Sequence, residues 1–394
     1  MTDIAMVYDR SETDEIGINL TAQEMEIDLY YLPFYKVSVG FGNSGYSYRS
    51  PGRDHTAALR DIKVVLNRIQ SKNRRIYAST IFEAFGKMVL NPLNVELACQ
   101  SKIRTLLTFF KDDIGIPRTV YMPCNVQESI VGGGTLNNSD VMSEMITQQL
   151  GNGKLVIKPD AGTHGSGITL AEGKEALKEM LKDINPSIIN PSGVVVQEFI
   201  PKWFYDLRII VEKEKGKPGF CHPTALVRGG FKDFRTNTFL GNMVFRTKLP
   251  SAVKKKAVRC GESIGAGAEA WVLALDAMPY IGDERVVGDD EMKTYFRALE
   301  DSFAEVKKVK QDPMKKVDFA KYSKNIEEAY TRYMSTEAYA KIQAVIQESL
   351  EKKQDSVLFH EGNACPEFWE QTRIVAGINV GESLLRCANS LLDA

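Results

Sequence analysis

The sequence predicts a mixed α/β protein that carries one long helical segment. Three observations support this prediction. Short β-branched runs alternate with helix-like stretches over the first quarter of the chain, which is typical of a small open sheet. A strand that ends in Lys158 opens into a glycine-rich loop, and residues 279–354 show helical spacing of apolar residues. We therefore expect sheets over most of the chain and a purely helical segment late in it.

Composition limits the classes of function that need to be considered. The chain has 394 residues, enough for two or three domains, and its 50 Lys and Arg nearly balance 51 Asp and Glu. This balance argues against a nucleic-acid binder that works through a broad basic field. Six cysteines without a Cys-x-x-Cys pair and four dispersed histidines predict free thiols and no zinc site. No apolar run approaches the roughly 20 residues of a membrane span, so we expect a cytoplasmic protein without a membrane partner.

The N-terminal part shows the alternation of strands and helices most clearly. We expect strands at residues 4–10, 27–32, 62–68 and 88–90, a helix at 13–25, and a glycine- and serine-rich loop at 40–52. Arg68 stands at the carboxyl end of its strand, where ligand crevices form in open sheets. A ligand-binding arginine and a solvated surface arginine are equally compatible with this position.

An amphipathic helix at Ser101–Asp113 begins the next unit. Its apolar stripe is predicted at Ile103, Leu106, Leu107 and Phe110, and Lys102 stands beside that stripe. A strand at residues 119–122 and a glycine-rich stretch at 130–138, predicted to be mobile, follow. Lys102 and the later Lys158 therefore bracket a second α/β unit.

The loop after Lys158 carries three glycines and two hydroxyl side chains. Its residues are Gly162, Thr163, Gly165, Ser166 and Gly167. Glycines let backbone amides approach a polyanion, and the lysine adds a fixed positive charge. The spacing fits neither the phosphate loop that ends in Gly-Lys-Ser/Thr nor Gly-x-Gly-x-x-Gly. A glycine-rich hairpin with a purely structural role is the alternative.

Two further strands carry polar residues toward the same region. The strand at residues 194–198 leads into Phe199 and Ile200, and its end could contact an adenine through backbone groups and a ribose through Glu198. Asp206 and Arg208 lie on the next strand; Arg228, Asp233, Arg235 and Asn237 follow on another strand and its loop. Three arginines would be unfavourable in an apolar core, so we expect them at a site for a polyanion.

A candidate metal site lies late in the chain. Glu361 and Asn363 are two residues apart on a predicted strand and share one face of it. With Asp276 at the end of another buried run, they form an all-oxygen set suited to Mg²⁺. Spacing alone fits a surface strand equally well. Between these residues we expect three helices, separated at Pro313 and Ser335, and a final helix at 380–392.

Taken in order, these pieces resemble the RimK/LysX-like branch of the ATP-grasp carboxylate–amine ligases, over most of the chain except residues 279–354. The motifs are Val7-Tyr8-Asp9-Arg10, Lys102, Lys158 with its loop, Gln197-Glu198-Phe199-Ile200, Asp206-Leu207-Arg208, Asp233-Phe234-Arg235-Thr236-Asn237, Glu361-Gly362-Asn363-Ala364-Cys365-Pro366 and Gly377-Ile378-Asn379-Val380. The resemblance implies an ATP-grasp fold with a Rossmann-like pre-ATP-grasp domain at 1–97. A flap domain at 98–198 and a C-terminal domain at 199–394, with a helical insertion at 279–354, would follow.

The resemblance also implies ATP and Mg²⁺ (or Mn²⁺) as cofactors. The residues that correspond to nucleotide-binding positions are Lys102, Lys158, Gly162, Thr163, Gly165, Ser166, Gly167, Gln197, Glu198, Phe199, Ile200, Asp206, Arg228 and Asn237. Asp276, Glu361 and Asn363 would hold the metal. A substrate carboxylate would become an acyl phosphate, and the amine of an amino acid would then displace the phosphate. Arg208 and Arg235 would stabilise the tetrahedral intermediate.

The implied activity is therefore ATP-dependent formation of an amide bond, with glutamate as one candidate amino acid. The implied partners are a carboxylate on a small molecule, a peptide or a carrier protein, and a second copy of the chain in a dimer or tetramer. Two features depart from the family: Phe239 and Leu240 replace a His-Arg pair, and the helical insertion is foreign to its short members. An enzyme that makes ester or amide crosslinks on a peptide is one alternative. A nucleotide-binding scaffold without catalysis is the other, although a full metal set argues against it.

Overall fold

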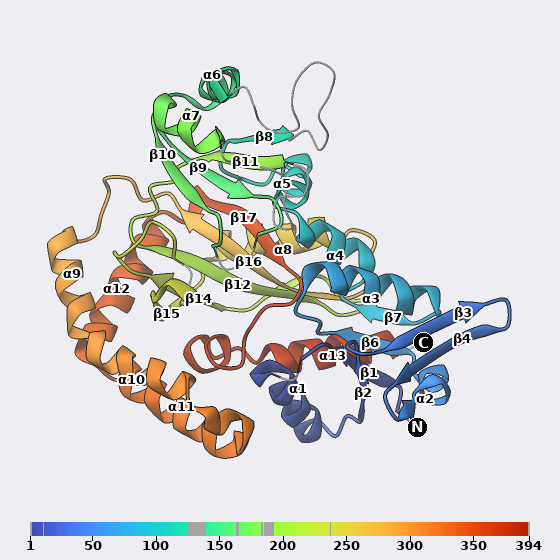
Figure 1. The fold of residues 1–394 in the computed structure, drawn as a ribbon. Helices are drawn as coiled ribbons and strands as arrows, with labels where there is room; N and C mark the ends of the chain where they lie inside the picture. The colour runs from blue at the N-terminus through green and yellow to red at the C-terminus, as the bar shows by residue number, and fades with distance from the viewer. Residues whose placement is uncertain are drawn as a thin grey trace.

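The protein is described by a computed structural model that covers residues 2–10, 12–123, 139–162, 165–182, 184, 193–236 and 238–392. Three large sheets follow one another along the chain, and a small three-stranded hairpin sheet projects from the first of them (Figure 1). A group of helices packs against the edge of the third sheet. The predicted domain boundaries stay a prediction.

The N-terminal sheet is parallel. Its strands are β1 (Ile4–Tyr8), β2 (Leu29–Pro33), β6 (Val64–Asn67) and β7 (Met88–Leu90), in the order β2-β1-β6-β7, and its helices are α1 (Thr13–Glu24), α2 (Thr56–Asp61), α3 (Lys72–Ala84) and α4 (Leu93–Gln100). The predicted strands and the predicted helix at 13–25 are confirmed. All four strands carry buried apolar residues, as strands covered on both faces do.

The prediction of a loop at residues 40–52 is wrong. This segment forms most of the hairpin sheet of β3 (Ser38–Gly42), β4 (Gly45–Ser50) and β5 (Arg53–Asp54). Tyr46 stacks on Phe85 at 4.1 Å between ring centroids, and buried Tyr48 packs against Phe82. These alternate tyrosines pack one side of β4 against the helix beside it. The glycine and serine residues around them made the segment look like a loop in the sequence.

Arg68 fits neither of its two predicted roles. Its side chain is 1% exposed, which excludes a solvated arginine, and it lies beneath the loop that follows β17 (Val357–Asn363). It donates to the carbonyl of Pro366 and lies 3.5 Å from Asp14 and 3.7 Å from Glu15. Arg68 therefore joins the N-terminal sheet to the C-terminal part of the chain.

The second sheet is antiparallel and has a hydrophobic core of its own. Its strands are β8 (Thr119–Pro123), β9 (Lys154–Pro159), β10 (Thr169–Glu172) and β11 (Gly193–Glu198), in the order β10-β9-β11-β8, with helices α5 (Lys102–Lys111), α6 (Ser139–Leu150) and α7 (Lys174–Lys182). On β9, Leu155 and Ile157 enter this core, whereas Val156 and Lys158 face a pocket on the other side. The period-2 alternation of a strand thus sets the direction of Lys158.

Helix α5 forms as predicted, but its buried face is not the predicted stripe. Lys102, Thr105, Leu106 and Phe109 are buried, while Leu107 is 52% exposed and Phe110 is 69% exposed. Polar contacts orient the helix: the Lys102 ammonium donates to the carbonyl of Gly162, and the Thr105 hydroxyl donates to that of Ala98. Counting apolar residues alone therefore places the buried face incorrectly.

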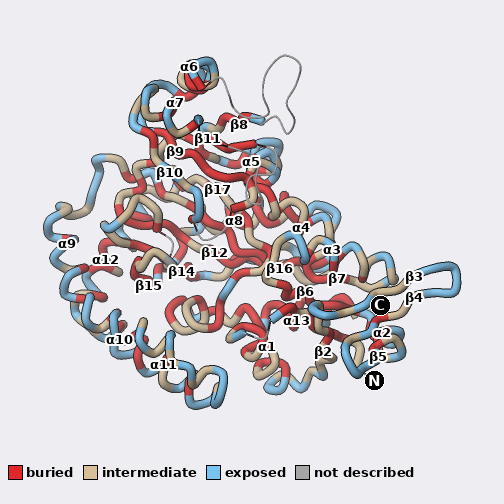
Figure 2. The backbone as a smooth tube through the Cα atoms, viewed as in Figure 1, coloured by how far each residue is buried: buried red, intermediate tan, exposed pale blue. Residues whose placement is uncertain are grey.

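The third, central sheet is antiparallel and forms the main core. Its strands are β12 (Tyr205–Lys213), β13 (Phe220–Cys221), β14 (Thr224–Gly229), β15 (Met243–Lys248), β16 (Trp271–Pro279) and β17, in the order β15-β14-β12-β16-β17 with β13 beside β12, and its helices are α8 (Ser251–Ile264) and α13 (Val380–Leu392). Buried residues of this sheet, of α13 and of the N-terminal sheet belong to one continuous cluster (Figure 2).

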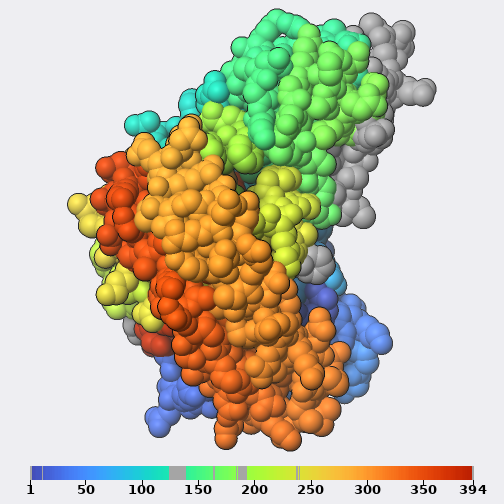
Figure 3. All heavy atoms as spheres, turned by 90° about the vertical axis from the view of Figure 1, so that its left-hand side faces the viewer, coloured from blue at the N-terminus to red at the C-terminus, as the bar shows by residue number. Residues whose placement is uncertain are grey.

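The helical insertion contains four main helices rather than the predicted three. They are α9 (Asp289–Ala298), α10 (Glu300–Lys310), α11 (Phe319–Met334) and α12 (Glu337–Lys352). The additional break falls at Leu299, which is buried and ends α9. Figure 3 shows these orange and red helices side by side, covering one face of the molecule below the green flap region.

The insertion protects an edge of the central sheet. Strand β15 ends the strand order, so one side of its backbone lacks a neighbouring strand. Tyr333 donates to the carbonyl of Val244, Tyr339 accepts from the amide of Arg246, and Gln347 accepts from the amide of Lys248. Packing of the helices on their own domain is therefore the observed arrangement. None of the helices in the described part of the chain combines the length and apolar character needed to span a bilayer.

The contact between α8 and the central sheet leads to a stability prediction. A Cβ added to Gly261 would lie 2.3 Å from the ring of fully buried Trp271, whereas a Cβ on exposed Gly153 would meet nothing within 4 Å. Gly261→Val should lower the free energy of unfolding by about 2 kcal/mol or more, because a packed core must shift. Gly153→Val should change it by no more than about 0.5 kcal/mol. Thermal unfolding of both variants measures this; equal melting temperatures would contradict the packing of α8.

Candidate active site between the flap and the central sheet

The strand register sets a row of charged side chains across the central sheet. Arg208 on β12 is paired in register with Asp276 on β16, and Asp276 is paired with Glu361 on β17. The register then shifts, so that Ala277 faces Phe359 and His360 is the extra residue. Such a bulge re-aims side chains and is common beside active sites. Arginine, aspartate and glutamate are thus brought together by backbone pairing alone.

Asp276 stands at the centre of a buried ion-pair network. Arg208 contacts it through two hydrogen bonds of 3.0 Å, and Arg228 lies 3.2 Å from its Oδ2. Arg228 also donates to Asp206 at 2.9 Å. Burial alone raises the pKa of Asp276, but Arg208 and Arg228 outweigh that effect and hold it well below its usual range. The carboxylate of Asp276 therefore stays ionised.

Two buried lysines project into the same region. The Lys158 ammonium donates to Gln197 at 2.6 Å, and the Lys102 ammonium donates to Gly162 at 2.7 Å. Burial, with the neighbouring charge of Lys102, lowers the pKa of Lys158 to about 8. Burial likewise lowers the pKa of Lys102, although Glu361 opposes the effect. Glu361 lies 4.0 Å from the Lys102 ammonium, and among the described residues no carboxylate oxygen accepts a hydrogen bond from either lysine, which leaves both available to phosphate oxygens.

A small pocket of about 80 Å³ lies between the two sheets and contains many of the predicted nucleotide-binding residues. Those that line it are Lys158, Gln197, Glu198, Phe199, Ile200 and Asp206, and Arg235, which was predicted to be catalytic, lines it as well. Lys102 and the glycines lie above it in the flap, and Arg228 lies below it in the central sheet. The structure therefore brings most of the predicted residues into one place, although they come from four strands, three loops and helix α5.

Glu198 differs from its predicted placement within this pocket. Its carboxylate accepts from the side chain and the amide of Arg118, both at 2.8 Å, and so is directed toward the start of β8. The backbone of residues 198–200 remains at the pocket wall. Contact of the Glu198 carboxylate with a ribose stays a prediction, and it requires this ion pair to open.

The glycine loop of the flap touches the central domain through Arg235. Arg235 pairs with Asp233 and donates to the carbonyl of Gly165 at 3.2 Å. Gly165 and Gly167 adopt positive φ values of 76° and 70°, which side chains with a Cβ rarely adopt. The glycines are therefore required by the turn, and Ser166 between them is exposed. Thr163, Asn237 and the side chain of Phe239 lie outside the described residues, as does the stretch at 130–138.

The three predicted metal ligands lie on two adjacent strands. Glu361 lies 3.7 Å from Lys72 and 4.0 Å from Lys102, and the Nδ2 atom of Asn363 is buried without a hydrogen-bond partner. Asp276, by contrast, already contacts two arginines. Within the described ranges, no group of three His, Cys, Asp or Glu side chains could hold a metal alone. The set fits a hard cation that takes some of its oxygens from a bound phosphate, as Mg²⁺ does.

Two residues of the pocket were missed in the sequence. Lys202 is buried, donates to Thr236 at 2.6 Å and lies 3.6 Å from Asp206. His360 lines the pocket with a buried Nε2 that has no hydrogen-bond partner. Burial, reinforced by Lys158, lowers the pKa of His360 to about 3, so the imidazole is neutral. No spacing rule reveals His360, because its direction depends on the bulge between β16 and β17.

Comparison with known proteins agrees with this arrangement. Residues 130–278 match the sequence profile of the RimK-like ATP-grasp domain. This part of the chain is therefore similar to a RimK-like ATP-grasp domain. The matched range covers the glycine loop, the pocket wall, the arginines and Asp276, and it ends where the helical insertion begins.

Individual relatives show similarity at low identity. The alpha-aminoadipate--LysW ligase LysX of Sulfurisphaera tokodaii is 23% identical over 266 residues, which are 66% of this chain and 81% of that protein. A probable alpha-L-glutamate ligase of Marinobacter nauticus is 24% identical over 216 residues, 54% of this chain and 64% of that protein. The macrocyclase MdnC of Microcystis aeruginosa, solved with its precursor peptide MdnA, aligns over 100% of both chains with a TM-score of 0.55 and 13% identity.

The predicted family resemblance, the mixed α/β ATP-grasp fold and the assignment as an ATP-grasp ligase are confirmed by these matches. ATP-grasp ligases use ATP, so the nucleotide prediction is confirmed at that level. The roles of single residues, the metal and the substrates remain predictions.

The lowered pKa of Lys158 leads to a prediction about pH. Phosphate oxygens favour the charged ammonium, so nucleotide binding raises this pKa again. The complex then holds more protons than the free protein, and nucleotide affinity falls as pH rises above about 8. Calorimetry of ADP binding at pH 8.5, in two buffers of different ionisation enthalpy, should detect proton uptake.

Lys158→Met should reduce that uptake, while Lys154→Met, an exposed lysine on the same strand, should leave it unchanged. Some proton uptake should persist in both variants, because the pKa of Lys102 is lowered too and a bound nucleotide would also raise it. An equal proton uptake by wild type and Lys158→Met would contradict the assignment of Lys158 to the phosphates.

Proposed function

We propose that this protein is an ATP-dependent carboxylate–amine ligase that activates a carboxylate as an acyl phosphate and joins it to the amine of an amino acid. One observation carries the proposal: the row of Arg208, Asp276 and Glu361 lies across three neighbouring strands, close to Lys102 and Lys158. Such a row combines cations for phosphate oxygens with acids for a divalent cation. The matches to ligases support the same reaction class.

The nucleotide is proposed to bind between the flap sheet and the central sheet. Residues 198–200 would contact the base through their backbone, and Lys102 and Lys158 would neutralise the phosphates. His360 and Lys202, whose polar atoms line the pocket, would add contacts that the sequence did not predict. The glycine loop, which already contacts Arg235, would close over the phosphates and exclude water from the acyl phosphate.

Asp276, Glu361 and Asn363 are the residues that would hold Mg²⁺ or Mn²⁺. When bound, a divalent cation neutralises charge that develops on the transferring phosphoryl group. Asp276 can serve in this way only if it shares its oxygens with Arg208 and Arg228 or releases one of them. Arg208 would then be free to donate to a substrate oxyanion, together with Arg235. We therefore propose that exchange of these ion pairs accompanies substrate binding.

The names of the relatives suggest candidates for the acceptor carboxylate and for the added amino acid. LysX is named for alpha-aminoadipate and LysW, and the Marinobacter protein is named for glutamate; substrates of both kinds are candidates here. MdnC was solved with a precursor peptide, so a crosslink within a peptide is the second candidate, supported by likeness of fold alone. Assembly as a homo-oligomer stays a prediction.

The identity of the nucleotide product tests the reaction class. Protein mixed with Mg²⁺, ATP, pooled amino acids and pooled carboxylates should release ADP and phosphate in equal amounts, because an acyl phosphate is formed. Glu361→Gln should slow this release by about 100-fold or more, since it removes charge at the transferring phosphoryl group. Glu269→Gln, on an exposed turn, is the matched control and should be neutral.

Chromatography of the nucleotides and mass spectrometry of the products provide the measurement, and the product mass separates an amide from an ester. Stoichiometric AMP and pyrophosphate would exclude the proposed mechanism. A Glu361→Gln variant as fast as wild type at saturating Mg²⁺ would exclude Glu361 as a metal ligand.

A further inference from the structure

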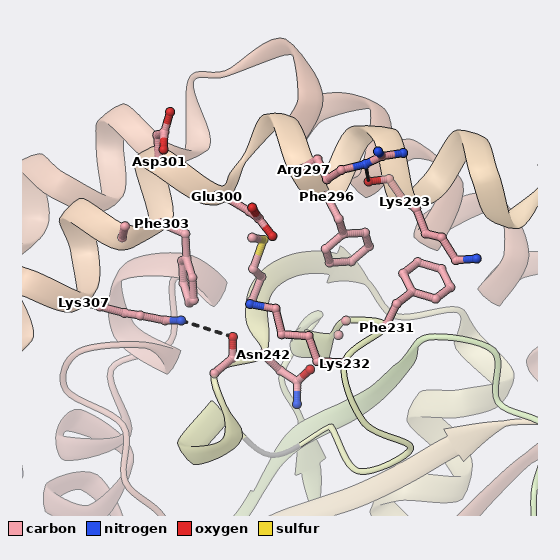
Figure 4. A pocket seen from close by; sticks show the side chains of 15 residues that line it. Phe231, Lys232, Asn242, Lys293, Phe296, Arg297, Glu300, Asp301, Phe303 and Lys307 are labelled. Carbon is pink, nitrogen blue, oxygen red and sulfur yellow. Dashed lines mark hydrogen bonds between the residues drawn. The ribbon is translucent and has the colours of Figure 1, made fainter.

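A second and larger cavity lies outside the nucleotide pocket. It has a volume of about 620 Å³ and is lined by the end of β14, the start of β15, two parts of the loop between them, and helices α9 and α10 (Figure 4). Volumes of about 300 to 1,000 Å³ are typical of sites for small molecules and short segments. The part of the cavity wall formed by α9 and α10 belongs to the insertion, which begins beyond the range of the matched ATP-grasp domain.

One loop separates this cavity from the nucleotide pocket. Residues 229–232 and 241–243 line the cavity, while residues 234–236 of the same loop line the nucleotide pocket. The side-chain amide of Asn242 donates to the carbonyl of Arg235 at 2.9 Å, so the two walls are bonded to each other. A molecule in the cavity would therefore lie one loop away from the proposed reaction centre.

The floor of the cavity is aromatic. Phe231 and Phe296 meet edge to face at 5.5 Å between centroids, and Phe303 stands further along α10. Phe204 packs beneath both Phe231 and Phe296, which fixes the rings in place. Rigid aromatic rings of this kind offer a preformed surface to an apolar group.

The rim of the cavity carries four cations and two carboxylates. The cations are Lys232, Lys293, Arg297 and Lys307, and the acids are Glu300 and Asp301. Among the described residues, no carboxylate lies within ion-pair distance of Lys232, Arg297 or Lys307. Burial lowers the pKa of Lys307; the nearby charge of Lys232 adds to this effect, and Glu300 opposes it. Positive charge is therefore in excess beside an apolar floor.

We propose that this cavity binds an amphipathic anion: an apolar group against the three phenylalanines and an anionic group among the four cations. In the ligase of the previous subsection, this anion is the part of the acceptor that does not react, while its reacting carboxylate reaches past the loop toward Arg235. The identification of the anion as acceptor rests on the proposed function. The existence of the site rests only on the cavity and its charges.

A fluorescent probe tests the site without any catalysis. 1-Anilinonaphthalene-8-sulfonate (ANS) is an aromatic anion, and N-phenyl-1-naphthylamine has the same rings without the sulfonate. Both are titrated into protein saturated with Mg²⁺ and AMPPNP, so that the nucleotide pocket is occupied. Lys232→Gln/Lys293→Gln should weaken ANS binding about three- to tenfold, as expected for two partly exposed charges. Binding of the uncharged probe should not change.

Lys308→Gln is the matched control, because Lys308 is an exposed neighbour of Lys307 on α10 that does not line the cavity. It should leave both probes unaffected. ANS binding that is equal in the double variant and in wild type would overturn the proposal. An equal loss for both probes would remove the role of charge and overturn it as well.

The acceptor role has its own readout in the ADP-release assay. The double variant should raise the carboxylate concentration needed for half-maximal rate and leave the KM for ATP unchanged. A raised KM for ATP alone would place the effect in the nucleotide pocket and overturn the acceptor role. If no mixture releases ADP with wild type, the proposed function fails, while the probe titrations still decide whether the cavity binds anions.

Discussion

The buried ion pairs of Asp276 are the interaction on which the rest of the site depends. A charge in the interior is unfavourable unless it is paired and hydrogen-bonded, and Asp276 is contacted by Arg208 and Arg228 at once. The pairing needs strands β14, β12 and β16 in a fixed register, because one residue of slip would turn each side chain to the opposite face. The ion pairs therefore form only in this strand register, and the buried charges in turn disfavour any other register.

The same constraint links the site to the surrounding helices. Strand β15 completes the sheet beside β14, and the insertion covers the unpaired edge of β15 through tyrosine and glutamine side chains. On the other side, the bulge on β17 lies beside His360, which lines the pocket. The insertion is thus both a structural cover for the sheet and, through α9 and α10, a wall of the second cavity.

Sequence reasoning succeeded where one local pattern decides the outcome. Helix α13 begins and ends at the predicted residues, and the alternation along β9 directs Lys158 to the pocket. It failed where tertiary contacts decide. The hairpin of β3 and β4 depends on tyrosines that meet the distant Phe82 and Phe85, and the face of α5 depends on a lysine that bonds to Gly162.

The residues of the candidate site could be predicted as a set, but the ion pairs and hydrogen bonds between them could not. Residues far apart in sequence, such as Arg208 and Asp276, were assigned separate roles, and the structure pairs them directly. Glu198 was expected at a ribose and is held by Arg118. His360 could not be predicted, because the register shift between β16 and β17 does not change the spacing of residues in the sequence. Pairing between distant strands is the information that a single sequence lacks.

The most direct test of the account is anomalous diffraction at the manganese edge from crystals grown with Mn²⁺ and AMPPNP. The account predicts manganese peaks beside Glu361 and Asn363, with Asp276 turned at least partly away from Arg208 and the phosphates on Lys102 and Lys158. Nucleotide bound elsewhere, or manganese absent from Glu361 while the Asp276 ion pairs stay intact, would contradict it.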